Sequence, residues 1–188
     1  MKRDAQLTRQ RIHDAATAES ARHGIAGARI DRIAEVSGSN KSMIYTYYDS
    51  KDRLFDAIFD ASVVRCVDDI PIDAHDLPEY AARLFDHYRE RPEALRLGIW
   101  DWLERGGEGM RIAAVVESNA SKVDAIRHAQ RDGAISARFP APTLLELILA
   151  LSLTSLTRPT TTDGHEDTTE TSRRRQAIKD AATNLLRD

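Results

Sequence analysis

One short segment near the N-terminus carries side chains of the kind that contact another molecule. The spacing predicts a helix over residues 41–48, in which Ile44 and Tyr48 lie four residues apart on one face. The opposite face carries short polar and aromatic residues where an ordinary exposed helix would show Glu and Lys: Ser42, Met43, Tyr45 and Thr46. Such side chains suit the base edges and phosphates of a nucleic acid. The spacing alone fits a recognition helix and, equally, a helical hairpin with a solvated face.

A second short helix must hold this face in place. Residues 30–37 carry Ile33 and Ala34 at the spacing needed to pack against Ile44 and Tyr48. Alanine is small, so the two helices can cross closely at that point. The pair therefore predicts a compact unit with one polar side left free.

The turn between the two helices and its flanks add further groups. Gly38 allows the positive φ of a tight turn, and Asn40 can cap the helix that follows. Lys41 and Tyr47 flank the polar face, and Lys51 begins the next helix, whose positive N-terminus can hold a phosphate. These features together form the helix-turn-helix pattern.

Residues 30–55 resemble the DNA-binding domain of TetR-family repressors. They follow the pattern IA-x3-G-x-x-K-x3-Y-x-Y-Y-x-S-K-x-x-L, which begins at Ile33 and ends at Leu54. Ile12 and Gly24 stand at the spacing of that family's first helix, so the resemblance covers residues 8–60. It implies an all-α, dimeric protein that binds operator DNA and usually releases it when a small molecule binds the C-terminal domain.

The resemblance also implies a division into two domains. Residues 1–50 would form a three-helix helix-turn-helix domain that binds DNA. Residues 51–188 would form a helical domain that binds an effector and dimerises, with about nine helices in the whole chain. The heads of a dimer would then read a near-palindromic operator in successive major grooves.

Two departures from the family pattern bear on this expectation. Arg29 stands where a Ser or Thr usually caps the second helix and touches phosphate, so the contact is expected from its charge. Glu19 and Ser20 stand where Leu-Phe is usual, and Ser39 replaces an apolar turn residue, which predicts a head of modest stability that leans on the fourth helix. The predicted DNA contacts are Arg29, Ser39, Asn40, Lys41, Ser42, Met43, Tyr45, Thr46, Tyr47 and Lys51.

Helical spacing continues through the rest of the chain, and no segment alternates convincingly enough for a strand. Alanine is abundant, with 26 residues against 7 valines, which also favours helices. A connector is expected over residues 68–78, and a mobile polar loop over 158–171. The predicted helices outside residues 30–48 span 7–23, 51–67, 78–91, 93–105, 110–132, 142–157 and 172–187.

The helix predicted over residues 93–105 is apolar on nearly every side and is expected to be central. Its main stripe would be Leu95, Ile99, Trp102 and Leu103. The plain interpretation is an aromatic core. The alternative is an effector pocket, because such pockets are apolar with few polar groups. The pocket residues would be Phe85, Tyr88, Trp100, Trp102, Leu103 and Met110.

The last two predicted helices are candidates for a dimer interface. Leucines crowd residues 144–156 on more than one face, and the final helix carries small residues that allow a close approach. Two such helices from each subunit would form a four-helix interface about a two-fold axis. The predicted interface residues are Leu145, Ile148, Leu149, Ser152, Ile178, Ala181, Ala182 and Leu185.

Composition sets the limits of the remaining hypotheses. The chain carries 27 basic and 30 acidic residues, but residues 1–50 hold 8 against 6, which weakly favours nucleic-acid contact by the head. Cys66 is the single cysteine, so no internal disulfide and no cysteine-based zinc site can form. The six histidines show no metal-ligand spacing, and no nucleophile motif or phosphate loop is found, so neither a metal, a cofactor nor catalysis is expected.

The chain is expected to be soluble and cytoplasmic, because its first residues lack the apolar core of a signal peptide and no apolar stretch is long enough to span a bilayer. Two other functions stay open from the residues alone. One is a helical DNA-binding protein without a ligand, acting constitutively or as an architectural factor. The other is an all-α carrier or enzyme that uses the tryptophan-rich region.

Overall fold

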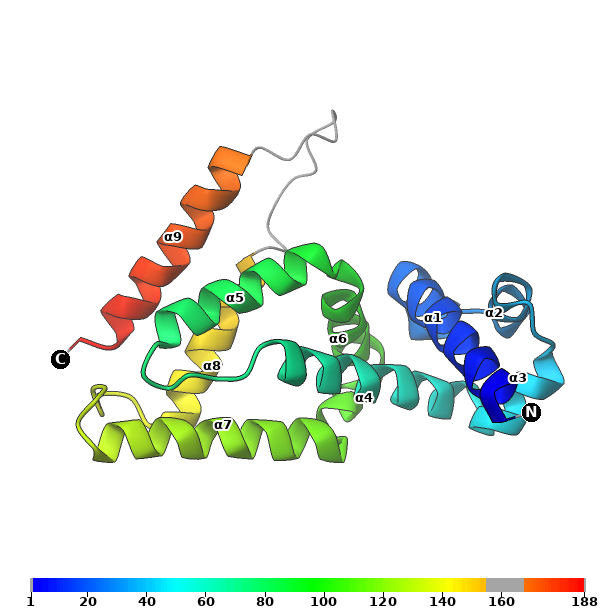
Figure 1. Ribbon diagram of the computed structural model, residues 1–188, viewed down its shortest axis with the longest axis horizontal. Helices are drawn as coiled ribbons and strands as arrows, with labels where there is room; N and C mark the ends of the chain where they lie inside the picture. Colours follow the sequence, from blue (N-terminus) through cyan, green and yellow to red (C-terminus); the bar gives the residue numbers. More distant parts are fainter. Residues whose placement is uncertain (1, 155–167, 188) are drawn as a thin grey trace. The chain divides into compact units, whose positions relative to one another are not determined.

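The computed structural model describes residues 2–154 and 168–187, and every regular element in this part of the chain is helical (Figure 1). The predicted all-α class is confirmed. The elements are α1 (Lys2–Gly27), α2 (Ile30–Ser37), α3 (Lys41–Tyr48), α4 (Lys51–Asp69), α5 (Leu77–Glu90), α6 (Pro92–Arg105), the 3-10 turn η1 (Glu108–Arg111), α7 (Ala113–Arg131), α8 (Ala141–Ser152) and α9 (Thr168–Leu185).

The chain divides into two compact units. The first, called the head unit here, comprises residues 1–65 and 92–116. The second, called the body unit, comprises residues 66–91 and 117–188. Residues 51–65 and 92–116 are thus packed with the N-terminal helices, while a functional boundary at residue 50 stays a prediction.

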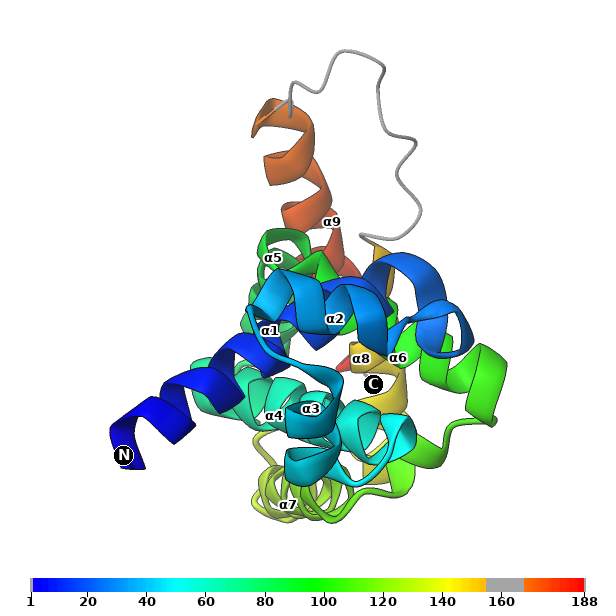
Figure 2. The same ribbon diagram turned by 90° about the vertical axis from the view of Figure 1, so that its right-hand side faces the viewer.

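In the head unit, α1 packs against α2 and α6 around an apolar core. Figure 2 shows α2 followed by the short turn that leads into α3. Ile12, Ile44 and Ile58 are at most 1% exposed within this core, so α1, α3 and the first half of α4 all contribute to it. The expected dependence of the small domain on the fourth helix therefore has a direct basis in Ile58 and its neighbour Phe55.

Helix α1 departs from its predicted span of 7–23 at both ends. It begins at Lys2, and Gly24 interrupts it with a φ of 78° before the last turn to Gly27. A Cβ at Gly24 would lie 2.5 Å from Glu104 Oε1 and 3.1 Å from the Trp100 ring. Glycine is therefore required there both by the backbone conformation and by the close approach of α6.

Helix α6 has the predicted position in the sequence, but the predicted stripe and the central location are wrong. Trp102 and Leu103 are 69% and 60% exposed, whereas Leu97 and Asp101 are fully buried. The reason is that α6 contacts α1 with one face, on which Trp100 Nε1 donates a hydrogen bond to the Ala21 carbonyl at 3.3 Å. Apolar residues on its other faces are left at the surface.

In the body unit, α5 packs against both α8 and α9. Leu77, Tyr80, Leu144, Ile148 and Ala182 are at most 2% exposed in its core. The unit therefore has its own apolar centre, to which α5, α7, α8 and α9 contribute.

Several predicted boundaries after α6 need correction. Residues 110–132 are not one helix, because η1 precedes α7, which starts at Ala113. Helix α8 ends at Ser152, and α9 already begins at Thr168, so residues 168–171 of the expected loop are helical. Residues 158–167 of that loop, and Leu156 of the leucine-rich segment, lie outside the described residues.

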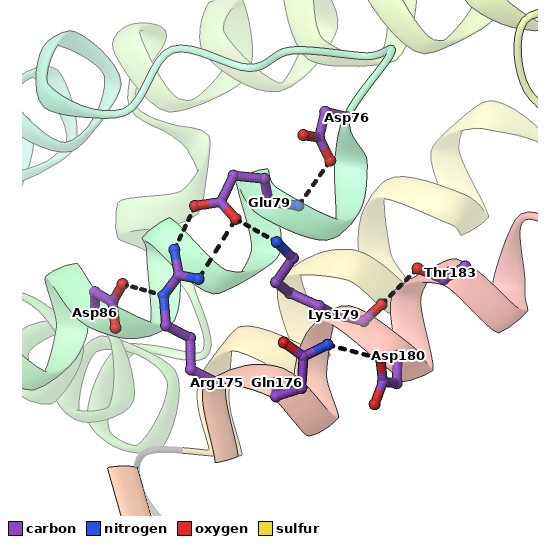
Figure 3. A network of polar contacts seen from close by, with 8 residues as sticks. All are labelled: Asp76, Glu79, Asp86, Arg175, Gln176, Lys179, Asp180 and Thr183. Atoms are coloured by element: carbon purple, nitrogen blue, oxygen red, sulfur yellow. Dashed lines mark hydrogen bonds and ion pairs between the residues drawn. The ribbon is translucent and has the colours of Figure 1, made fainter. Parts of the chain in front are cut away.

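Ion pairs join α9 to α5 along one side (Figure 3). Arg175 bonds to Glu79 and, through Nε, to Asp86 Oδ2 at 2.8 Å. Lys179 Nζ lies 2.8 Å from Glu79 Oε2. These bonds hold the pKa of the Glu79 carboxyl below its usual value, so Glu79 is the shared anion of this network.

Candidate nucleic-acid interface

The two sides of α3 differ as the sequence predicts. Ile44 and Tyr48 are 1% and 5% exposed and share the head core with Ile33 and Ala34. The polar and aromatic face points away from that core, with exposed side chains at Ser42, Met43, Tyr45 and Thr46. The orientation of α3 is thus confirmed, and contact of this face with DNA follows as an interpretation.

The turn that leads into α3 is fixed by its own hydrogen bonds. Gly38 has a φ of 64°, and its N–H caps the end of α2. The Asn40 side chain accepts a hydrogen bond from Met43 N at 2.8 Å, so it caps α3. The Thr46 hydroxyl donates to the Ser42 carbonyl at 2.8 Å. The exposed face therefore sits on a helix whose start and preceding turn are held by hydrogen bonds within the chain.

Two of the predicted lysine contacts have partners within the chain. Lys41 forms an exposed ion pair with Asp31 of α2. Lys51 Nζ donates a hydrogen bond to the Ala26 carbonyl at 2.8 Å, at the end of α1. A phosphate that approached Lys41 would have to compete with Asp31, whereas Lys51 has donors left for a second acceptor.

Glu19 makes bonds that the sequence analysis did not predict. Its carboxylate accepts hydrogen bonds from Arg29 N at 3.0 Å and Arg32 Nε at 2.7 Å. It thus fixes Arg29, the residue before α2, while the first turn of α2 has no side-chain cap, and the modest stability expected of this domain stays a prediction. Burial alone would raise the pKa of Glu19, but the bonds from Arg32 and Arg29 outweigh it and hold the pKa below its usual value. The Arg29 guanidinium is left exposed.

No local sequence pattern reveals these bonds of Glu19, because Arg29 follows it by ten residues. Two departures from the family pattern hinted at these bonds. An acid stands at a position that is usually apolar, and the next helix lacks its usual Ser or Thr. Ser39 and Tyr47, also predicted to contact DNA, are both half-buried at the edge of the exposed face.

The residues predicted to line an effector pocket fall in different units. Phe85 is 2% exposed and Tyr88 half-buried in the core of the body unit. Trp100 is half-buried in the head unit. Trp102, Leu103 and Met110 also belong to the head unit and are exposed. The structure thus brings Phe85 and Tyr88 into one core, and the effector role of the set stays a prediction.

The residues predicted for a dimer interface are mostly covered by their own chain. Five of them are at most 4% exposed in the core of the body unit: Leu145, Ile148, Ser152, Ile178 and Ala182. Leu149, Ala181 and Leu185 are half-buried. A partner can reach the second group and its exposed neighbours, whereas the first group has almost no surface left to offer.

Metal-binding groups and membrane-spanning helices are two further features to consider in the part of the chain that the structure describes. Within residues 2–154 and 168–187, no three side chains of the metal-binding types gather where they could hold an ion. Over the same ranges, no helix combines the length and apolar character needed to cross a bilayer.

A helix-turn-helix with an exposed polar face, in a chain whose described elements are all helical, defines a DNA-binding transcriptional regulator. The family described as "Bacterial regulatory proteins, tetR family" matches residues 12–58. The family described as "Tetracyclin repressor-like, C-terminal domain" matches residues 76–183. The chain belongs to the TetR family of transcriptional regulators.

Curated relatives and solved structures agree with this assignment. The chain is 42% identical to the HTH-type transcriptional repressor SCO4008 of Streptomyces coelicolor, over 80% of this chain and 79% of the relative. It is 31% identical to the HTH-type transcriptional repressor NicS of Pseudomonas putida, over 54% of this chain and 51% of that relative. The crystal structure of the transcriptional regulator SCO4942 from Streptomyces coelicolor has a TM-score of 0.79 and 33% identity, and the match covers 95% of this chain and 98% of that one.

Proposed function

We propose that the chain is a cytoplasmic repressor that binds a near-palindromic operator as a homodimer and leaves it when a small apolar or aromatic molecule binds. The names of the curated relatives support repression rather than activation. The proposal assigns the chain no catalytic step. It requires three properties, which are DNA recognition by α3, dimerisation, and a response to a ligand.

The exposed face of α3 is the observation that carries the proposal. Its side chains are supported from behind by Ile44 and Tyr48, which are buried, and by the Asn40 cap. A recognition helix of this kind enters the major groove with its outward residues towards the base edges. Tyr45, at 43% exposure, and Met43, at 37%, offer apolar surface for thymine methyl groups beside the hydroxyls of Ser42 and Thr46.

A two-fold dimer fits this form of recognition. Two heads related by symmetry read two half-sites that lie about 34–36 Å apart. The half-buried Leu149, Ala181 and Leu185, with exposed neighbours such as Ala150 and Ala177, leave an apolar surface on α8 and α9 for a second copy. This surface is the support for dimerisation through the last two helices.

The ligand response needs a link between the two units. Helix α4 supplies residues 51–65 to the head unit and residues 66–69 to the body unit. A ligand that favours one of two head separations would shift the population between them, and DNA affinity would change by the same free energy.

Selection of bound sequences from a random duplex pool tests the first property. We expect an enriched near-palindrome, and Tyr45→Ala should weaken its binding by about 1–3 kcal/mol while the helical circular dichroism is unchanged. Trp102→Ala is the matched control, because Trp102 is an exposed aromatic residue of the head unit outside α3. Wild-type affinity of Tyr45→Ala, or equal losses in both variants, would contradict the assignment of α3.

A further inference from the structure

The core of the body unit contains a small group of polar side chains, called the polar core cluster here. Its members come from three helices: Cys66 of α4, Tyr80 and Tyr88 of α5, and Ser118 and Lys122 of α7. Tyr88 donates a hydrogen bond to the Cys66 sulfur, and Cys66 also interacts electrostatically with Lys122 and Tyr80. Ser118 lies four residues before Lys122, so both occupy one face of α7. The two segments of the chain that form the body unit, residues 66–91 and 117–188, thus both contribute to this cluster.

Two hydroxyls of the cluster have no hydrogen-bond partner among the residues that the structure describes. They are Tyr80 OH and Ser118 Oγ, and both atoms are buried. Tyr80 as a whole is only 2% exposed, so its hydroxyl does not reach bulk solvent. Buried polar groups are almost always paired in native proteins, with protein groups or with ordered water. Each of these two hydroxyls therefore has a hydrogen bond to offer to a group from outside the chain.

Lys122 gives the cluster a positive charge without a counter-ion. Its side chain is half-buried, and no carboxylate of the described residues pairs with it. Asp69, the acid that acts electrostatically on Cys66, is already held by Arg91 at 3.0 Å. Burial lowers the pKa of the Lys122 ammonium and raises the pKa of the Cys66 thiol, so the thiol stays neutral at pH 7 and offers no compensation.

We propose that the polar core cluster binds a small organic acid, whose carboxylate pairs with Lys122 and accepts hydrogen bonds from the Tyr80 and Ser118 hydroxyls. The rest of the ligand packs against the apolar side chains of the body core, such as Phe85 and Leu84. Lys122 and Cys66 are half-buried, so the charged end of the cluster is reached from solvent. This proposal rests on the proposed effector response and adds the chemical class of the effector. The site includes none of the tryptophans of the head unit.

The test compares ligands that differ in charge and little else. Benzoate, 1-naphthoate and octanoate are the acidic probes, their primary amides are the neutral ones, and benzyltrimethylammonium is the cationic one. We expect the acids to raise the melting temperature, because a ligand that binds only the folded state stabilises it. The amides and the cation should leave it unchanged. If no acid raises the melting temperature, or amides or the cation match the acids, the proposal fails.

Variants of the cluster connect that binding to its residues. Lys122→Met keeps the length of the side chain and removes the charge, and it should weaken the binding of the acids at least about tenfold. Lys122→Arg should retain most of it, and Tyr80→Phe should lose several-fold. Arg127→Met is the control, because Arg127 lies on the same helix and is exposed. Without ligand, Lys122→Met should melt no lower than the wild type, since it removes an uncompensated charge. Wild-type acid binding by both Lys122→Met and Tyr80→Phe overturns the assignment.

Operator release is measured separately, so that the two proposals can fail independently. Acids that bind but leave the operator complex intact would uphold this site and contradict the ligand response of the proposed function. Release of DNA by the amides or by the cation would uphold the ligand response and contradict the acidic class of the effector.

Discussion

Two carboxylates of the head unit are held by backbone N–H groups that are distant from them in the sequence. Glu19 bonds to Arg29 N at the start of α2, and both oxygens of Asp101 accept from Gly109 N at 2.9 and 3.0 Å. Asp101 is fully buried, and Arg105 Nη1 lies 3.7 Å from it. In each case a carboxylate bonds to the backbone of a separate element, so a single substitution should disturb the structure at that point.

Glu19 makes the stability of the head unit depend on pH. Its pKa is depressed in the folded state, so its contribution is present above the unfolded-state pKa and is lost as pH falls through the folded value. We expect Glu19→Gln to lower the free energy of unfolding by about 1–2 kcal/mol at neutral pH, and the difference to shrink as the pH falls below the ordinary glutamate pKa of 4.5. Urea unfolding at neutral and at acid pH measures this. Glu35→Gln, at an exposed site of α2, should change neither value, and a loss for Glu19→Gln that does not vary with pH would contradict this account.

The approach of Gly109 to Asp101 gives a steric prediction. A Cβ on Gly109 would lie 2.9 Å from the buried Asp101 carboxylate, whereas a Cβ on Gly98 would meet nothing within 4 Å. We expect Gly109→Ala to destabilise the protein by about 1–3 kcal/mol. Gly98→Ala, inside α6, should be neutral or stabilising by up to about 1 kcal/mol. Thermal unfolding of both variants distinguishes them, and equal melting temperatures would show that the carboxylate can move aside.

At the level of helices, α2 and α3 could be predicted from the sequence, but the surroundings of α6 could not. The inward face of α3 could be predicted from Ile44 and Tyr48. The residues of α2 that share their core, Ile33 and Ala34, lie only a few residues before the turn. In α6 every face carries apolar residues, so spacing does not say which one is buried. The contact with α1, about 80 residues earlier in the sequence, selects the Leu97 face and leaves Trp102 exposed. Long-range contacts of this kind leave no local pattern.

The ion pairs between α5 and α9 should contribute modestly to stability. Arg175 and Glu79 are 31% and 32% exposed, so solvent screens their attraction. We expect Arg175→Met to cost about 1 kcal/mol, with a smaller effect at high salt. Arg173→Met removes a charge from an exposed site two residues away and should have no effect. Chemical unfolding at low and high salt tests the pair, and a salt-independent loss for Arg175→Met would indicate lost packing instead.

For the whole molecule, the burial of the predicted interface residues narrows the choice of surface for a second copy. Leu145, Ile148 and Ile178 already fill the core of the body unit, so a charge there would unfold the chain and say nothing about assembly. Leu149 and Ala181 are half-buried and remain suitable probes. Because operator recognition by two heads requires a dimer, the oligomeric state bears on the entire proposed function.

Ala181→Arg should convert a dimer into monomers. The substitution would bury an unpaired cation where the interface closes and cost several kcal/mol, so the monomers should bind one half-site weakly. Gln176→Arg is the control, because it lies five residues earlier and about 140° away around α9. Light scattering at micromolar concentration measures both. A wild-type monomer, or a dimer that survives Ala181→Arg, would contradict dimerisation through α9.

The separation of roles on α3 has a consequence for how regulators of this kind diverge. Ile44 and Tyr48 maintain the fold, while Ser42, Met43, Tyr45 and Thr46 take no part in the core. Mutations at the four outward positions can accumulate after a gene duplication without loss of folding. A descendant copy can therefore acquire a new set of target promoters while it keeps the same fold. We expect such copies to differ often at these four exposed positions and rarely at the two buried ones.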